Sequence, residues 1–106
     1  MNATGPSSDD FVETVLSVVV EIPPGFVMSY GDVAAAVGSR SARGVGRVMA
    51  HAGGEVAWWR VVRASGHPVE TLAARALEHY RAEGTPLAWA PSGAFRVDMR
   101  RARWAP

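Results

Sequence analysis

Residues 29–52 read SYGDVAAAVGSRSARGVGRVMAHA, and this stretch decides the fold. Ser29 is followed three residues later by Asp32, a capping signature that predicts a helix beginning at Tyr30. Small apolar residues continue as far as Gly38, which is expected to end the helix. The stretch therefore opens with one short, capped helix.

A second helix follows after only a few residues. Either Ser39 or Ser41 can cap it, and the sequence ARGVGRVMAHA at 42–52 carries it to the turn at Gly53 and Gly54. Two short helices joined by a short connection have the outline of a helix-turn-helix, a motif used by many DNA-binding proteins.

Two further helices are predicted on either side of this motif. Apolar residues recur at helical spacing from Phe11 to Val19, between a capped start at Asp10 and a break at the sequence IPPG. The same spacing holds from Val69 to Tyr80 and stops at the sequence EGTP. Both helices are expected to pack on the core.

The remaining segments are predicted to be extended, namely the WWRVV stretch at 58–62 and the tail at 95–99. We therefore predict a mostly α protein, a winged helix-turn-helix-like DNA-binding domain with a few short strands. The chain has 106 residues, enough for one domain at 9–106 after a flexible N-terminal tail at 1–8.

Composition excludes several kinds of chemistry. The chain has no cysteine, and therefore no disulfide, thiolate metal site or thiol nucleophile. His51, His67 and His79 lack metal-ligand spacing and are interpreted as surface or capping residues. There is no phosphate loop, dinucleotide fingerprint or apolar run of membrane-spanning length. We expect no metal, no cofactor and no membrane partner.

Charge is unevenly distributed along the chain. Residues 1–38 carry five acidic residues and no Arg or Lys, whereas residues 39–106 carry eleven arginines and five acidic residues, a regional charge of +6. Arginine suits forked contacts with phosphate. Genomic base composition would explain the choice of Arg over Lys, but not its placement. The start, MNATGPSSDD, does not resemble a secretion signal, so a cytoplasmic location is expected, nucleoid-associated if the source is bacterial.

The predicted helix at 42–52 has two distinct faces. Apolar residues fall on one side, namely Val45, Val48, Met49 and Ala52. Arg43, Arg47 and His51 line the other side, beside Gly44 and Gly46. Each helical glycine costs about 1 kcal/mol relative to alanine. Close approach to the minor groove of DNA would explain that cost, and so would tight packing between helices with the arginines merely solvated.

The helix-turn-helix outline and the basic charge favour DNA binding. The predicted DNA-contact residues are Tyr30 and six residues at the start of this helix: Ser41, Ala42, Arg43, Gly44, Gly46 and Arg47.

Three ordered motifs resemble the DNA-binding domain of the O6-alkylguanine-DNA alkyltransferases. They are IPPGFVMSYGDVAAAVG, ARGVGRVM and WWRVVRASG, and the family pattern is roughly IPxGxVxTYGxIA, ARAVGxAM and PCHRVV with SxG. The resemblance puts Trp58 at the position of the reactive cysteine and Trp59 at that of the histidine that activates it. Alkyl transfer by the family mechanism is therefore excluded. The chain is similar to the alkyltransferase-like proteins, a non-catalytic subgroup that binds O6-alkylguanine without repairing it.

The resemblance implies roles for individual residues. Tyr30 matches the tyrosine that helps to rotate the target nucleotide out of the duplex, although a core aromatic is the alternative. Arg43 matches the arginine that fills the vacancy in the base stack. Glu83 matches a glutamate that supports the activating histidine, and it is interpreted here as a structural cap.

The lesion pocket is expected beside Trp58. Met49 and Val62 are candidates to line it, with core packing as the alternative use of each. The segment after Gly66 lacks the arginine that alkyltransferase-like proteins place in the lesion-site loop. Arg63 and Arg75 are the candidates to replace it.

The expected function is to bind duplex DNA that contains O6-alkylguanine through the minor groove and to flip the lesion into a Trp-lined pocket. The bound lesion would then be marked for nucleotide excision repair proteins, and the protein is expected to be a monomer. A winged-helix transcription factor that reads undamaged DNA is the main alternative. An enzyme of an unrecognised type is a third.

Overall fold

The computed structural model describes residues 8–106, so the predicted N-terminal tail lies almost entirely outside the described residues. Helix α1 (Ser8–Glu21) begins two residues before the expected cap at Asp10. The other helical segments are α2 (Tyr30–Ala36), α3 (Ala42–Ala52), α4 (Ala73–Glu83), α5 (Met99–Ala102) and the 3-10 turns η1 (Gly53–Glu55), η2 (Trp58–Arg60) and η3 (Glu70–Leu72). The strands are β1 (Met28–Ser29), β2 (Val61–Val62), β3 (Leu87–Trp89) and β4 (Phe95–Val97). The fold is mostly α with a few short strands, as predicted.

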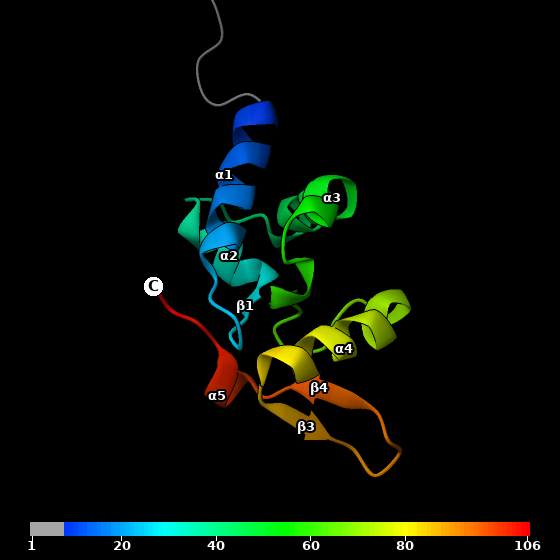
Figure 1. Ribbon diagram of the computed structural model, residues 1–106. Helices are drawn as coiled ribbons and strands as arrows, with labels where there is room; N and C mark the ends of the chain where they lie inside the picture. The colour runs from blue at the N-terminus through cyan, green and yellow to red at the C-terminus, as the bar shows by residue number, and fades with distance from the viewer. Residues whose placement is uncertain (1–7) are drawn as a thin grey trace, which may run out of the picture.

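Helices α1, α2 and α3 enclose a first core (Figure 1). Its buried members are mainly valines: Val15, Val19, Ile22, Met28, Val33, Ala34, Val45, Val48 and Val61. The spacing of the apolar residues in each helix turns one face toward this core, which is why the helices form and pack together. The helix-turn-helix predicted from residues 29–52 is therefore present, with α1 packed against both of its helices.

A second core lies below the first in Figure 1, among α4, the β3–β4 hairpin and α5. Its buried residues are Val27, Val62, Ala76, Tyr80, Val97 and Ala102. Helix α4 ends at Gly84, whose φ of +71° is a left-handed conformation that glycine adopts without strain. The sequence EGTP therefore ends the helix as predicted.

The parallel pair β1–β2 joins the two cores, with Met28 opposite Val61 and Ser29 opposite Val62. Successive side chains on a strand point to opposite sides, so each strand can serve two cores. Val61 belongs to the first core and Val62 to the second.

The end of the chain returns to the same junction. The amide of Val27 donates to the carbonyl of Ala102 (2.9 Å), and the amide of Trp104 donates to the carbonyl of Val27 (2.8 Å). The Trp104 side chain packs against the first core, whereas Ala102, two residues earlier, is buried in the second core.

Three predictions of local structure were wrong. The segment that contains the paired tryptophans is not extended, because η2 forms a 3-10 turn there. The α-helix predicted from Val69 starts at Ala73, after an extended Val69 (φ −59°, ψ 128°) and the turn η3. The strand predicted over 95–99 stops at Val97, because Asp98 caps α5 by accepting from the amide of Arg100 at 3.1 Å.

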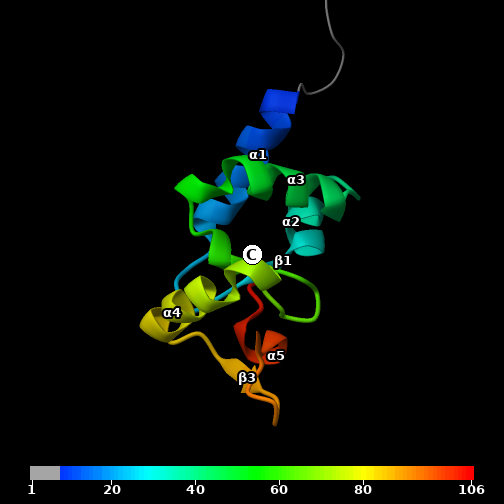
Figure 2. The same ribbon diagram turned by 90° about the vertical axis from the view of Figure 1, so that its right-hand side faces the viewer.

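The β3–β4 hairpin lies at the bottom of the molecule in Figure 2, away from α3, which lies beside α1 and α2 in the upper part. This hairpin would be the wing of a winged helix-turn-helix. In this position it does not extend the exposed surface of α3, the second helix of the motif. Among residues 8–106, no helix has the length and apolar composition needed to cross a membrane.

Candidate nucleic-acid interface and pocket

Helix α3 presents its capped N-terminus and two arginines to solvent. Ser41, rather than Ser39, caps it, because its hydroxyl oxygen accepts from the amide of Gly44 at 2.8 Å. Arg43 and Arg47 are exposed one turn apart. The partial positive charge of a helix N-terminus adds to that of the guanidinium groups, so this end of α3 attracts phosphate.

The two glycines of α3 have different roles. Gly44 is buried, and a Cβ atom there would lie 2.9 Å from the Ser41 hydroxyl oxygen and 3.5 Å from the Phe11 ring. Its prediction as part of the smooth outer face is therefore wrong, because the missing side chain makes room for the cap and for α1. A Cβ atom on Gly46 would meet nothing within 4 Å. Of these two glycines, only Gly46 therefore reduces the bulk of the outer face of α3.

Tyr30 is the first residue of α2 and is held by a complete capping box. The amide of Asp32 donates to the Ser29 hydroxyl (3.0 Å), and the amide of Ser29 donates to the Asp32 carboxylate (3.2 Å). Burial raises the pKa of the Tyr30 phenol, while the nearby Arg63 guanidinium acts in the opposite direction. The phenol is therefore a neutral group that can donate a hydrogen bond at physiological pH.

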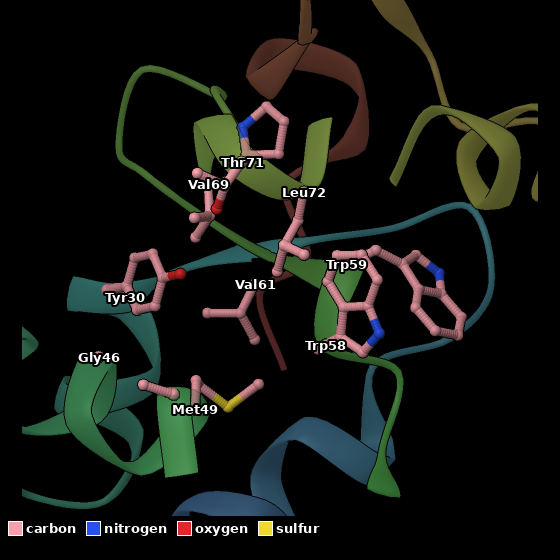
Figure 3. Close-up of a pocket in the computed structure, with 11 residues that line it drawn as sticks. Tyr30, Gly46, Met49, Trp58, Trp59, Val61, Val69, Thr71 and Leu72 are labelled. Atoms are coloured by element: carbon pink, nitrogen blue, oxygen red, sulfur yellow. The ribbon is translucent and has the colours of Figure 1, made fainter. Parts of the chain in front are cut away.

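A pocket of about 310 Å³ opens between α2, α3 and the chain around η2 and η3 (Figure 3). It is lined by Tyr30, Gly46, Met49, Ala50, Trp58, Trp59, Val61, Pro68, Val69, Thr71 and Leu72. Tyr30 and Met49 approach the space from one side, and Val69 and Leu72 approach it from another. Gly46 and Ala50 are shared between the pocket and the exposed face of α3, so the two features adjoin.

The paired tryptophans are fixed in η2 at one end of the pocket. Their rings meet edge to face, with centroids 5.5 Å apart and planes at 87°. The Trp59 ring stacks on His79 of α4 at 3.5 Å with an interplanar angle of 6°. The Arg75 guanidinium lies 5.7 Å from the centroid of the Trp58 ring. The neighbours on α4 thus hold both indoles in defined orientations.

Glu83 supports this end of the pocket from the C-terminus of α4. Its carboxylate accepts from the indole N–H of Trp59 (2.9 Å), from the Arg60 guanidinium (2.6 and 3.1 Å) and from the amide of Gly25 (3.2 Å). Burial acts to raise the pKa of Glu83, but these hydrogen bonds together lower it. The prediction of a purely structural cap was too narrow, because the carboxylate also orients Trp59.

The opposite wall of the pocket depends on a turn at Gly66. The amide of Gly66 donates to the carbonyl of Arg63 (2.8 Å), and the amide of Val97 donates to the carbonyl of Gly66 (2.9 Å). Gly66 has φ +94°, and a Cβ atom there would lie 2.2 Å from the Val97 carbonyl oxygen, so only glycine fits. This attachment to β4 fixes where the chain enters the pocket at Pro68 and Val69.

A family model described as the 6-O-methylguanine DNA methyltransferase DNA-binding domain matches residues 10–85, most of the chain. The chain belongs to this family. Within the family, a DNA base-flipping protein of Escherichia coli is 38% identical, over 91% of this chain and 75% of its own length. Alkyltransferase-like protein 1 of Schizosaccharomyces pombe is 31% identical over 92% of this chain and 97% of its own.

A solved structure of the same family agrees with the described fold. It is the S. pombe Atl1 protein in complex with damaged DNA that contains O6-carboxymethylguanine. It superposes with a TM-score of 0.79 at 30% identity and covers 92% of this chain and 97% of its own.

In this member of the family, the structure brings two of the four predicted pocket residues to the pocket. Trp58 and Met49 line the pocket as expected. Val62 does not, because it is fully buried in the second core; its neighbour Val61 lines the pocket instead. Arg63 does not line it either, and faces a separate hollow beside His67.

Four lining residues that follow the turn at Gly66 were not predicted from the sequence: Pro68, Val69, Thr71 and Leu72. Val69 and Leu72, two apolar residues three positions apart between Pro68 and a helix, are the signal that could have indicated them. The described residues contain no group of three or more His or acidic side chains that could hold a metal ion.

Proposed function

We propose that this protein binds duplex DNA that contains O6-alkylguanine, rotates the lesion out of the helix and holds it in the pocket without alkyl transfer. The observation that carries this proposal is that α3 serves two surfaces at once. Its start exposes Arg43 and Arg47, and its middle, at Gly46 and Met49, lines the pocket. A duplex seated on α3 therefore lies directly beside a cavity that can receive a base.

The first step is seating of the duplex. The capped start of α3 offers backbone N–H groups and guanidinium groups to phosphates, and Gly46 adds no bulk. A smooth, basic helix of this kind suits the narrow minor groove better than base reading in the major groove.

The second step is rotation of the damaged nucleotide. Flipping a base costs a few kcal/mol of pairing and stacking, and a lesion that pairs badly lowers that cost. Tyr30 stands at the side of the pocket, where its ring can crowd the backbone of the rotating nucleotide. Arg43, at the first turn of α3, would enter the vacated stack.

The third step is retention without reaction. The indole rings of Trp58 and Trp59 offer apolar surface to a purine, and the chain contains no thiol to accept an alkyl group. The E. coli relative is named for base flipping, and the S. pombe relative was crystallised with damaged DNA, which supports this sequence of steps. A retained, unrepaired lesion would be marked for nucleotide excision repair proteins.

Lesion preference tests the proposal most directly. We expect the native protein to bind a fluorescently labelled duplex with O6-methylguanine at least about tenfold more tightly than the same duplex with guanine. Arg43→Ala and Tyr30→Ala are expected to lose most of that preference. Arg96→Ala is the matched control, because it removes one exposed guanidinium from the distant hairpin.

Equal affinity of the native protein for both duplexes would contradict the proposal. Tight binding to one undamaged sequence would instead support the transcription-factor alternative.

A further inference from the structure

Among the described residues, those that line the pocket include no charged side chain. Its polar side-chain groups are the hydroxyls of Tyr30 and Thr71 and the indole N–H groups. The Trp59 N–H is already bonded to Glu83. The pocket therefore offers a few neutral hydrogen-bonding groups on an otherwise apolar and aromatic surface.

The arginines that surround the pocket are directed elsewhere. Arg60 is bound to Glu83, and Arg63 lines a different hollow, although its charge acts on the Tyr30 phenol at the side of the pocket. Arg75 lies over the Trp58 ring and is not among the lining residues. A negative charge that entered the pocket would thus meet no cationic side chain among the lining residues that lie within 8–106.

An unpaired carboxylate is costly in such surroundings. It loses hydration when it enters an apolar space, and the neutral donors among the described lining residues offset only part of that loss in the absence of a cation. The faces of aromatic rings also carry partial negative charge, so the paired indoles repel an anion that approaches their faces. A neutral alkyl group of the same size gains from burial against the same surface.

We propose that the pocket selects uncharged O6-alkyl groups and discriminates against anionic ones of the same size. This inference rests on the proposed function, since it concerns which lesion the pocket accepts. It predicts a difference from the S. pombe relative, whose structure contains O6-carboxymethylguanine.

Two isosteric adducts test this selection. In both O6-isobutylguanine and O6-carboxymethylguanine, a CH2 group carries one carbon with two further branches, which are two methyl groups or two carboxylate oxygens, and the adducts differ mainly in charge. In a titration of labelled duplexes, we expect the isobutyl duplex to bind at least about tenfold more tightly than the carboxymethyl duplex. Affinities for the two duplexes within twofold of each other would overturn the inference. This holds if Arg75 turns inward to pair with the carboxylate, and equally if the carboxylate stays in solvent.

Duplexes with guanine and with O6-methylguanine separate this failure from failure of the proposed function. Equal binding of those two duplexes would refute lesion binding itself. Clear preference for O6-methylguanine with no discrimination by charge would refute only the inference.

A substitution at the pocket should reverse the selection. Val69 lines the pocket and is 38% exposed. The aliphatic part of a longer side chain at this position can therefore stay in solvent while its end group reaches the cavity. Val69→Arg is expected to raise the relative affinity for the carboxymethyl duplex at least about fivefold.

Two variants control for this result. Val69→Gln adds length without charge, and Val20→Arg adds the same charge on α1, where Val20 is 65% exposed. Neither should change the ratio of the two affinities. An equal change in Val69→Gln or Val20→Arg would show that pocket charge does not set the selection.

Discussion

The two cores of this protein are built in different ways. The first is made almost entirely by residues 15–48, from helices that follow one another along the chain. The second gathers Val27, Val62 and residues from α4, the hairpin and α5, so its contacts are distant in sequence. The first core therefore depends on local helix signals and apolar spacing, whereas the second depends on how the chain returns to β1.

Two arginine–carboxylate pairs connect the parts of the chain that form the two cores, and the pairs differ in burial. Arg60 and Glu83 are 14% and 13% exposed, with a shortest N–O distance of 2.6 Å. Arg103 and Asp32 have the same shortest distance of 2.6 Å, but Arg103 is 60% exposed. Water screens the second pair far more strongly than the first. Because the shortest distances are equal, we expect burial to set the difference in how much each pair contributes to stability.

Removing the buried carboxylate should have the largest effect. Glu83→Gln leaves Arg60 without its charge partner and weakens the hydrogen bond from Trp59, so we expect a loss of about 3 kcal/mol in the free energy of unfolding. Urea denaturation measures it. Glu78→Gln, an exposed glutamate on the same helix, is the matched control and should change stability little. A loss below about 1 kcal/mol for Glu83→Gln would show that the pair does not secure the junction.

The same pair should govern stability in acid. Hydrogen bonds outweigh burial and lower the pKa of Glu83 in the folded state, so the unfolded chain binds this proton at a higher pH. The stabilisation is present above the unfolded pKa and is lost as the pH falls through the folded pKa. The Arg103 guanidinium similarly lowers the pKa of Asp32.

Urea midpoints measured from about pH 6 to pH 3 test this dependence. They should fall less steeply for Glu83→Gln than for Glu78→Gln. Parallel curves for the two variants would contradict the prediction.

Around the first core, substitutions at the two glycines of α3 should differ by a smaller amount in the free energy of unfolding. Gly46→Ala should raise the free energy of unfolding by up to about 1 kcal/mol, because alanine favours the helix and its Cβ meets nothing. Gly44→Ala should give no such gain, since its Cβ would lie 2.9 Å from the Ser41 hydroxyl. If Gly46 lies against DNA, Gly46→Ala should also weaken duplex binding despite its greater stability. Equal stabilisation by both substitutions would contradict the different roles assigned to the glycines.

The smallest effect is expected at the exposed pair. Arg103→Gln should cost less than about a third of the stability that Glu83→Gln costs, because the Arg103 charge is largely solvated in both the folded and unfolded states. Thermal unfolding of both variants, with Arg101→Gln as a neighbouring exposed control, measures the ratio. Comparable losses for Arg103→Gln and Glu83→Gln would show that the return of the chain to α2 matters as much as the buried pair.

Much of the local structure around the first core could be predicted from the sequence. The capping box of Ser29 and Asp32 acts within four residues, and the cap of Ser41 acts over the same distance, so both are visible in the sequence. Trp58 and Met49 were also placed correctly at the pocket. Gly44 was misplaced because its environment includes Phe11, a contact with another helix that no local pattern indicates.

By itself, the sequence determined the capped helices, the absence of a thiol and the motifs that identify the family, because each depends on neighbouring residues or on composition. Tertiary structure alone decided that Val61 rather than Val62 meets the pocket, that the paired tryptophans turn within a 3-10 segment, and that Glu83 holds Trp59. Each of these depends on chain segments that meet only after folding, when α4 and the end of the chain return to β1.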